Sequence, residues 1–196
     1  MRSRPPEAKS CPEEAPGVAM HRLFVAIRPP EPIRDLLLDA MDDSADFRWQ
    51  DEDQLHLTLR FIGEVDGRDA AAIDDALAAI RSPGFALELK GVGEFGGRNP
   101  RALWAGVRDE GPVVHLQRKI ESAVQRAGIA AEERKFSPHI TLTRLRGAPR
   151  DRVITFLSAH ALYASGPFEV NGFVLYSSTL TPNGSLYRPE RSYRLE

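Results

Sequence analysis

The sequence has 196 residues, of which 42% are hydrophobic and 28% charged, and its formal net charge is -2. These values are typical of a soluble globular protein of about one domain, and they exclude a globally basic nucleic-acid-binding protein. The single cysteine, Cys11, excludes an internal disulfide and a cysteine-based metal cluster. No window approaches the ~18 apolar residues of a membrane span, so we expect a cytoplasmic protein without a membrane segment.

The first 19 residues differ in composition from the rest of the chain. Residues 1–19 are rich in Pro, Glu and Ala and show no hydrophobic periodicity, which predicts a disordered leader. Met20 directly precedes the first ordered-looking run and is an alternative translation start. We therefore expect one folded domain over residues 20–196.

Strand-like and helix-like patterns alternate along this domain. Runs with a period of two or a buried apolar character predict strands at residues 22–27, 54–61, 85–90, 101–107, 139–145, 169–177 and 186–195. Amphipathic spacing predicts helices at residues 33–41, 70–80, 113–126 and 150–163. This order, with short linkers, indicates an α+β fold with mainly antiparallel sheet.

Two of the predicted strands carry the same short motif, His-x-Thr. His56 and Thr58 form the first copy, and His139 and Thr141 form the second. Residues i and i+2 of a strand point to one face, so each His–Thr pair shares a face while its apolar neighbours point to the other. We expect a bilobal structure in which two pseudo-symmetric sheets, with helices on the outside, line a central cleft.

Two imidazoles suit acid–base chemistry on a phosphodiester. One neutral ring can accept a proton from water, and one protonated ring can donate to the leaving oxygen. The Thr hydroxyls can hydrogen-bond the non-bridging phosphate oxygens. A purely structural interpretation, with edge histidines beside strand-favouring threonines, stays open. Asp51, Glu52 and Asp53 lack the ligand spacing of a hydrolytic metal centre, so we expect no metal and no cofactor.

The sequence resembles the RNA 2′,3′-cyclic phosphodiesterases, the LigT-like branch of the two-histidine (2H) phosphoesterases. Five segments carry the resemblance, at residues 22–30, 55–65, 93–107, 136–144 and 175–187. The resemblance implies a two-lobed α+β fold, with His56 as proton donor and His139 as proton acceptor. It also implies a substrate-binding role for Arg144. The segment Gly96-Gly97-Arg98 departs from the family, because it stands where a Pro-containing turn is expected.

Several neighbouring residues complete the predicted site. An ideal strand turns Arg144 away from His139, so its presence at the site requires a bulge or the strand end near Thr143. Phe136 is the aromatic residue best placed to stack on a base, whereas we expect Phe61 and Trp49 to pack in the core. Basic residues outnumber acidic ones two to one over residues 132–152, which suits an RNA backbone or simply a solvated loop.

These features predict hydrolysis of a ribose 2′,3′-cyclic phosphate, at an RNA end or in a cyclic nucleotide, to a 2′-phosphate. The alternatives are 2′–5′ RNA ligation by the reverse reaction and nucleotide binding without turnover. We expect a monomer with no obligate protein partner. The carboxylates of residues 51–53 favour a protonated His56, in agreement with its role as donor.

Overall fold

The structure is a computed structural model that describes residues 20–41, 47–182 and 184–196, so the predicted leader lies outside the described residues. Eight strands are found within these ranges: β1 (His21–Ile27), β2 (Leu57–Val65), β3 (Phe85–Phe95), β4 (Ala102–Val107), β5 (His139–Arg144), β6 (Ala164–Val170), β7 (Gly172–Thr181) and β8 (Gly184–Arg194). The same ranges contain four α-helices: α1 (Glu31–Asp39), α2 (Gly67–Ala78), α3 (Gly111–Arg126) and α4 (Arg150–Ala159).

The strands form one sheet in the order β6-β3-β4-β5-β2-β1-β7-β8, and every neighbouring pair is antiparallel. Two four-stranded halves meet at β2 and β5, where Leu57 pairs with Ile140. The predicted α+β class with antiparallel pairing is therefore confirmed. The two strands that carry the His-x-Thr motifs are the inner strands of their halves and lie next to each other.

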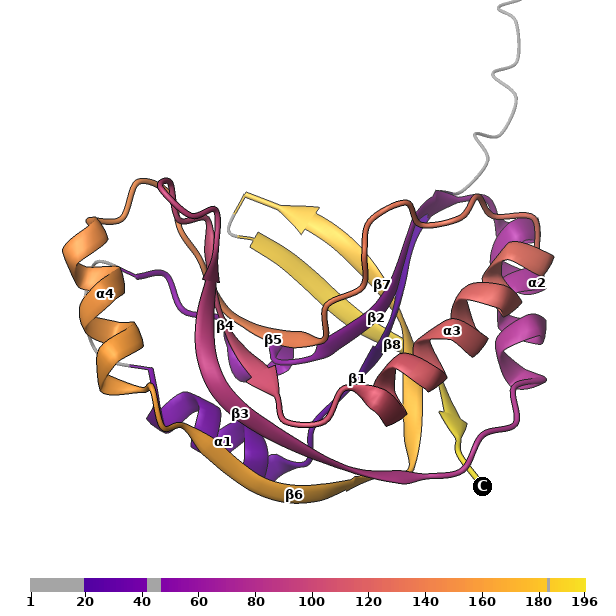
Figure 1. Cartoon of the computed structure of the whole chain (residues 1–196). Helices are drawn as coiled ribbons and strands as arrows, with labels where there is room; N and C mark the ends of the chain where they lie inside the picture. Colours follow the sequence, from indigo (N-terminus) through magenta and orange to yellow (C-terminus); the bar gives the residue numbers. More distant parts are fainter. Residues whose placement is uncertain (1–19, 42–46, 183) are drawn as a thin grey trace, which may run out of the picture.

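The helices cover one face of the curved sheet, with α1 and α4 beside one half and α2 and α3 beside the other (Figure 1). The main core lies between this face and the helices. It includes Leu57 and Ile140 from the central strands, Leu77 from α2 and Leu116 from α3. The opposite face, here called the open face, carries a smaller apolar cluster around Phe24 and Tyr176. Within the described residues, no helix is long and apolar enough to cross a membrane.

Two predicted strands differ from the structure. The predicted strand at 54–61 begins later, because Glu52–Gln54 form a 3₁₀ helix before β2. Two hydrogen bonds stabilise this turn. The Asp51 backbone N–H donates to Gln54 Oε1 over 3.2 Å, and the Gln54 backbone N–H donates to the Asp51 carbonyl over 2.8 Å. The predicted strand at 169–177 is two strands, β6 and β7, which separate at Asn171 and pair in different halves of the sheet.

Candidate active site

The pairing of β2 with β5 brings the two motifs together on the open face. Leu57 lies opposite Ile140 in antiparallel register, and both side chains are buried in the main core. The residues on either side of this pair must therefore point to the open face. The register sets His56 across from Thr141 and Thr58 across from His139. The four side chains consequently form one compact group, in which each histidine faces the threonine of the other motif.

A bulge in β5 returns Arg144 to the same face. The pairing of β4 with β5 skips Leu142, because Leu103 pairs with Thr143 and Trp104 pairs with Thr141. Leu142 and Thr143 are consecutively buried, which shifts the strand's alternation by one residue. Arg144 is exposed, and its charge acts on both His56 and His139. Of the two expected ways to redirect Arg144, a bulge or the strand end, the structure has the bulge.

A matching bulge in β2 places Phe61 at the position equivalent to Arg144. The pairing of β1 with β2 skips Leu59, and Leu59 and Arg60 are both buried. Phe61 is 37% exposed, and the Arg22 guanidinium lies 5.1 Å from its ring centroid. The prediction that Phe61 packs in the core is therefore wrong, since the bulge turns it outward.

Each imidazole is oriented by the backbone two residues before it. His139 Nδ1 lies 2.7 Å from the Ser137 carbonyl oxygen, and His56 makes the corresponding backbone hydrogen bond to Gln54. A carbonyl oxygen only accepts, so His139 Nδ1 carries a hydrogen and Nε2 holds the free lone pair of the neutral ring. Nε2 of His139 is therefore available as a proton acceptor.

Aromatic rings surround both histidines. The Phe24 and Tyr187 ring centroids lie 4.9 and 5.2 Å from that of His56, and the Phe95 centroid lies 4.8 Å from that of His139. These contacts join residues distant in sequence, and the motif pattern gave no signal for them. The rings limit the orientations of the imidazoles and reduce their contact with water.

This environment lowers the pKa of both histidines. Burial lowers the pKa of His56 to about 4, and the positive charge of Arg144 acts in the same direction. Burial, and then Arg144, also lowers the pKa of His139 from its usual 6.5. The backbone hydrogen bonds oppose these effects only partly. Both rings are therefore mainly neutral at pH 7 in the free protein.

The expected influence of the nearby carboxylates on His56 is wrong. Glu52 accepts hydrogen bonds from Arg34 at 2.7 and 2.9 Å, and Asp53 pairs with Arg28 at 2.8 Å. Their charges are compensated by these guanidinium groups, and the pKa of His56 is lowered by burial instead of raised. The carboxylates therefore do not explain how His56 would become protonated.

The remaining predicted aromatic residues pack against the main core. Phe136 is partly buried against the main core. Trp49 also packs there, with its ring centroid 5.2 Å from that of Phe156, as the sequence predicts. The unusual turn at Gly96 follows Phe95, and a side chain at Gly96 would clash with the Asn99 carbonyl. Glycine at this turn thus allows the bend that follows the ring beside His139.

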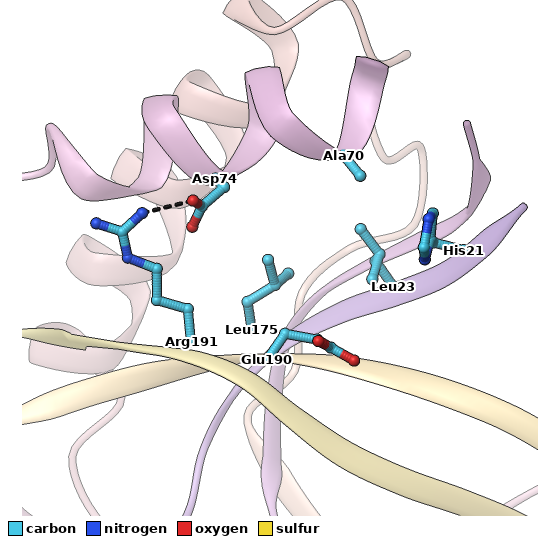
Figure 2. Close-up of a pocket in the computed structure, with 7 residues that line it drawn as sticks. All are labelled: His21, Leu23, Ala70, Asp74, Leu175, Glu190 and Arg191. Atoms are coloured by element: carbon cyan, nitrogen blue, oxygen red, sulfur yellow. Dashed lines mark hydrogen bonds and ion pairs between the residues drawn. The ribbon is translucent and has the colours of Figure 1, made fainter. Parts of the chain in front are cut away.

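One cavity lies on the helix-covered side, between α2 and strands β1, β7 and β8 (Figure 2). Its volume is about 280 Å³. Asp74 on its wall accepts hydrogen bonds from Arg191 and from the Tyr193 hydroxyl, both at 2.5 Å. Asp74 and Arg191 pair with each other, and Glu190 accepts a hydrogen bond from Ser177, so the cavity offers little for recognition of a charged ligand.

An α+β fold whose antiparallel sheet presents two His-x-Thr pairs on one face defines a two-histidine phosphoesterase. The chain belongs to the 2′-5′ RNA ligase superfamily, whose sequence model matches residues 27–181. A curated relative from Aeropyrum pernix, named RNA 2′,3′-cyclic phosphodiesterase, is 35% identical over 141 residues, which cover 70% of this chain and 80% of the relative.

Solved structures agree with this assignment. Escherichia coli LigT in its apo form aligns with a TM-score of 0.74 and 29% identity, covering 90% of this chain and 98% of LigT. LigT complexed with 3′-AMP aligns with a TM-score of 0.72 and 31% identity, covering 90% of this chain and 99% of that chain. The family resemblance seen in the sequence is therefore confirmed.

Proposed function

We propose that this chain is a cytoplasmic enzyme that hydrolyses ribose 2′,3′-cyclic phosphates, at RNA ends or in nucleotides, to 2′-phosphates. The observation that carries the proposal is the β2–β5 register, which sets both His-x-Thr pairs side by side on the open face. The curated relative's name, RNA 2′,3′-cyclic phosphodiesterase, supports the same reaction. The proposed chemistry uses neither a metal nor a cofactor.

In this reaction water attacks phosphorus and the bond from phosphorus to the ribose 3′ oxygen breaks. His139 takes a proton from the water through Nε2, and His56 donates a proton to the leaving 3′ oxygen. Thr58 and Thr141 hydrogen-bond the non-bridging oxygens as negative charge develops on them. Arg144 supplies positive charge to the same group, and Phe136 stays our predicted base contact.

The substrate itself can set the proton on His56. In the free protein His56 is neutral at pH 7, because its pKa is about 4. A bound phosphate carries a negative charge, and an opposite charge within ~4–6 Å favours the protonated form of an imidazole. We therefore expect His56 to gain its proton when substrate binds.

The reaction is tested by incubating the purified chain with a 2′,3′-cyclic nucleotide and with RNA ending in a cyclic phosphate, each with and without EDTA. We expect turnover of both to a 2′-phosphate, unchanged by EDTA because the two imidazoles perform the proton transfers. Product identity is read from the phosphorus NMR spectrum. Absence of turnover overturns the proposed function. Loss of turnover in EDTA that Zn²⁺ or Mn²⁺ restores overturns the metal-independent mechanism.

Ligation is a second candidate, favoured by the superfamily to which the chain belongs. By microscopic reversibility the same residues would join a cyclic phosphate end to a 5′-hydroxyl, giving a 2′–5′ bond. Supplying both RNA ends in excess tests this directly. A 2′–5′ linked product establishes ligation, whereas release of 2′-phosphate alone leaves hydrolysis as the reaction.

Gln54 is expected to position His56. Its side-chain amide donates to the Ser185 carbonyl of β8 over 2.9 Å, and its backbone holds the His56 ring. We expect Gln54→Ala to lower kcat about 10- to 100-fold with little change in KM, because small displacements of a catalytic group are costly. Gln54→Glu keeps the side-chain oxygen that accepts from the Asp51 N–H but loses the Nε2 group that donates to the Ser185 carbonyl. This variant therefore isolates the contribution of the hydrogen bond to β8.

The matched control is Gln125→Ala, because Gln125 is exposed on α3, away from both motifs, and its side chain donates to Glu121 over 2.7 Å. Its steady-state kinetics should equal those of the wild type. Equal kinetics in Gln54→Ala and Gln125→Ala would show that Gln54 has no positioning role.

A further inference from the structure

A basic groove lies between the end of α2 and the exposed face of α3, on the helix-covered side of the sheet. Its volume is about 520 Å³. Four cationic side chains line it, together with a histidine and a serine: Arg81, Arg118, Lys119, Arg126, His115 and Ser122. Apolar groups at residues 79 and 80 complete the lining, which includes no acidic side chain. This concentration of positive charge contrasts with the formal net charge of -2 of the whole chain.

The α3 sequence arranges this lining. His115, Arg118, Ser122 and Arg126 are spaced by three or four residues and therefore form one stripe along the helix. The stripe is exposed, whereas Leu116 and Ile120 on the opposite side are fully buried. The helix thus packs by its apolar side and presents the basic stripe to solvent.

The cations differ in how much of their hydrogen-bonding capacity is already used. Lys119 Nζ donates to the Arg81 carbonyl over 2.6 Å, and Arg81 donates to the Ala78 and Ile80 carbonyls at the end of α2. Among residues 20–41, 47–182 and 184–196, the side chains of Arg118 and Arg126 have neither an ion pair nor a hydrogen bond. Two guanidinium groups therefore face the groove with their donors available.

We propose that this groove binds backbone phosphates of an RNA strand; the inference rests on the proposed function. Guanidinium groups match phosphate oxygens bidentately, and contacts of this kind carry no base specificity. The groove has no Phe, Tyr or Trp in its lining to stack on a base and no carboxylate for ribose hydroxyls, so it suits a phosphate chain better than a whole nucleotide. Because α3 packs against β2 on the side away from the open face, only a strand that passes from one face of the sheet to the other contacts both sites.

The test compares the double variant Arg118→Gln/Arg126→Gln with wild type on two substrates. One is a 2′,3′-cyclic mononucleotide, and the other is an RNA of ~20 nucleotides that ends in a cyclic phosphate. This RNA is longer than the ~4–16 nucleotides that one single-strand-binding fold covers. For the long RNA we expect KM to rise about tenfold. We also expect the slope of log affinity against log salt to become shallower by about 1.4, because each neutralised phosphate of a single strand contributes ~0.7 and the variant neutralises two fewer. Mononucleotide kinetics should stay unchanged.

The control is Arg68→Gln/Arg194→Gln, which removes two exposed arginines outside the groove. Affinity is also measured by fluorescence anisotropy with RNA ending in a 2′-phosphate, so a failure of the proposed catalysis does not prevent the binding test. Equal RNA affinity and salt slope in the groove variant and wild type would overturn the proposal. Binding of inorganic phosphate or polyphosphate that depends on Arg118 and Arg126, together with an unchanged RNA affinity in the groove variant, would also overturn the proposal. The groove would then be assigned to a free anion.

Discussion

We expect His56→Ala and His139→Ala each to lower kcat about 10²- to 10⁴-fold, the range that one acid–base group contributes. Both rings lie on the open face beside the threonine of the other motif, so each substitution removes a proton transfer without emptying the main core. The measurement is single-turnover hydrolysis of a 2′,3′-cyclic nucleotide, with circular dichroism to check the fold. Turnover within threefold of wild type in either variant would remove that histidine from the mechanism.

A substrate with an activated leaving group separates the two roles. A phosphodiester of 4-nitrophenol loses a stable phenolate, which needs little help from an acid. His56→Ala should then approach wild-type turnover, whereas His139→Ala should stay strongly impaired, because water still needs a base. Rescue of His139→Ala instead would reverse the roles. The lowered pKa values do not separate the histidines by themselves, since both are shifted in the same direction.

The face shared by each His–Thr pair could be predicted from sequence, because strand alternation is a local property. The same holds for the apolar partners Leu57 and Ile140, which are buried in the main core. Their pairing could not be predicted in this way. Cross-strand register depends on contacts between residues far apart in the chain, and a slip by one residue would turn a motif into the core.

The two bulges and the aromatic surroundings were also beyond local patterns. Skipping Leu59 turns Phe61 outward, and skipping Leu142 does the same for Arg144. For Arg144 the sequence indicated only that a bulge or the strand end would have to redirect the side chain. Phe24 and Phe95 reach the histidines from β1 and β3, so their roles depend on strand order, which tertiary packing decides.

A buried ion pair connects the two halves of the site. Arg60, which follows the skipped residue of β2, is 6% exposed and lies 2.6 Å from Glu121 of α3. It also donates to the Ala130 carbonyl over 2.5 Å and approaches Glu132 at 3.5 Å, in the segment that leads toward His139. Arg60 thereby joins the strand after the first motif to the segment before the second.

We expect Arg60→Met to lower the free energy of unfolding by about 3–5 kcal/mol, because it leaves the partly buried Glu121 carboxylate without its cationic partner. The matched control is Arg134→Met. Arg134 contacts the same Glu132 at 3.0 Å, but its side chain is 79% exposed, so the decrease should stay within ~0–1 kcal/mol. Urea denaturation at pH 7 measures both, and Arg60→Met/Glu121→Met should recover part of the stability by removing the unpaired charge. Equal unfolding free energies for Arg60→Met and Arg134→Met would show that the buried pair does not hold α3 to β2.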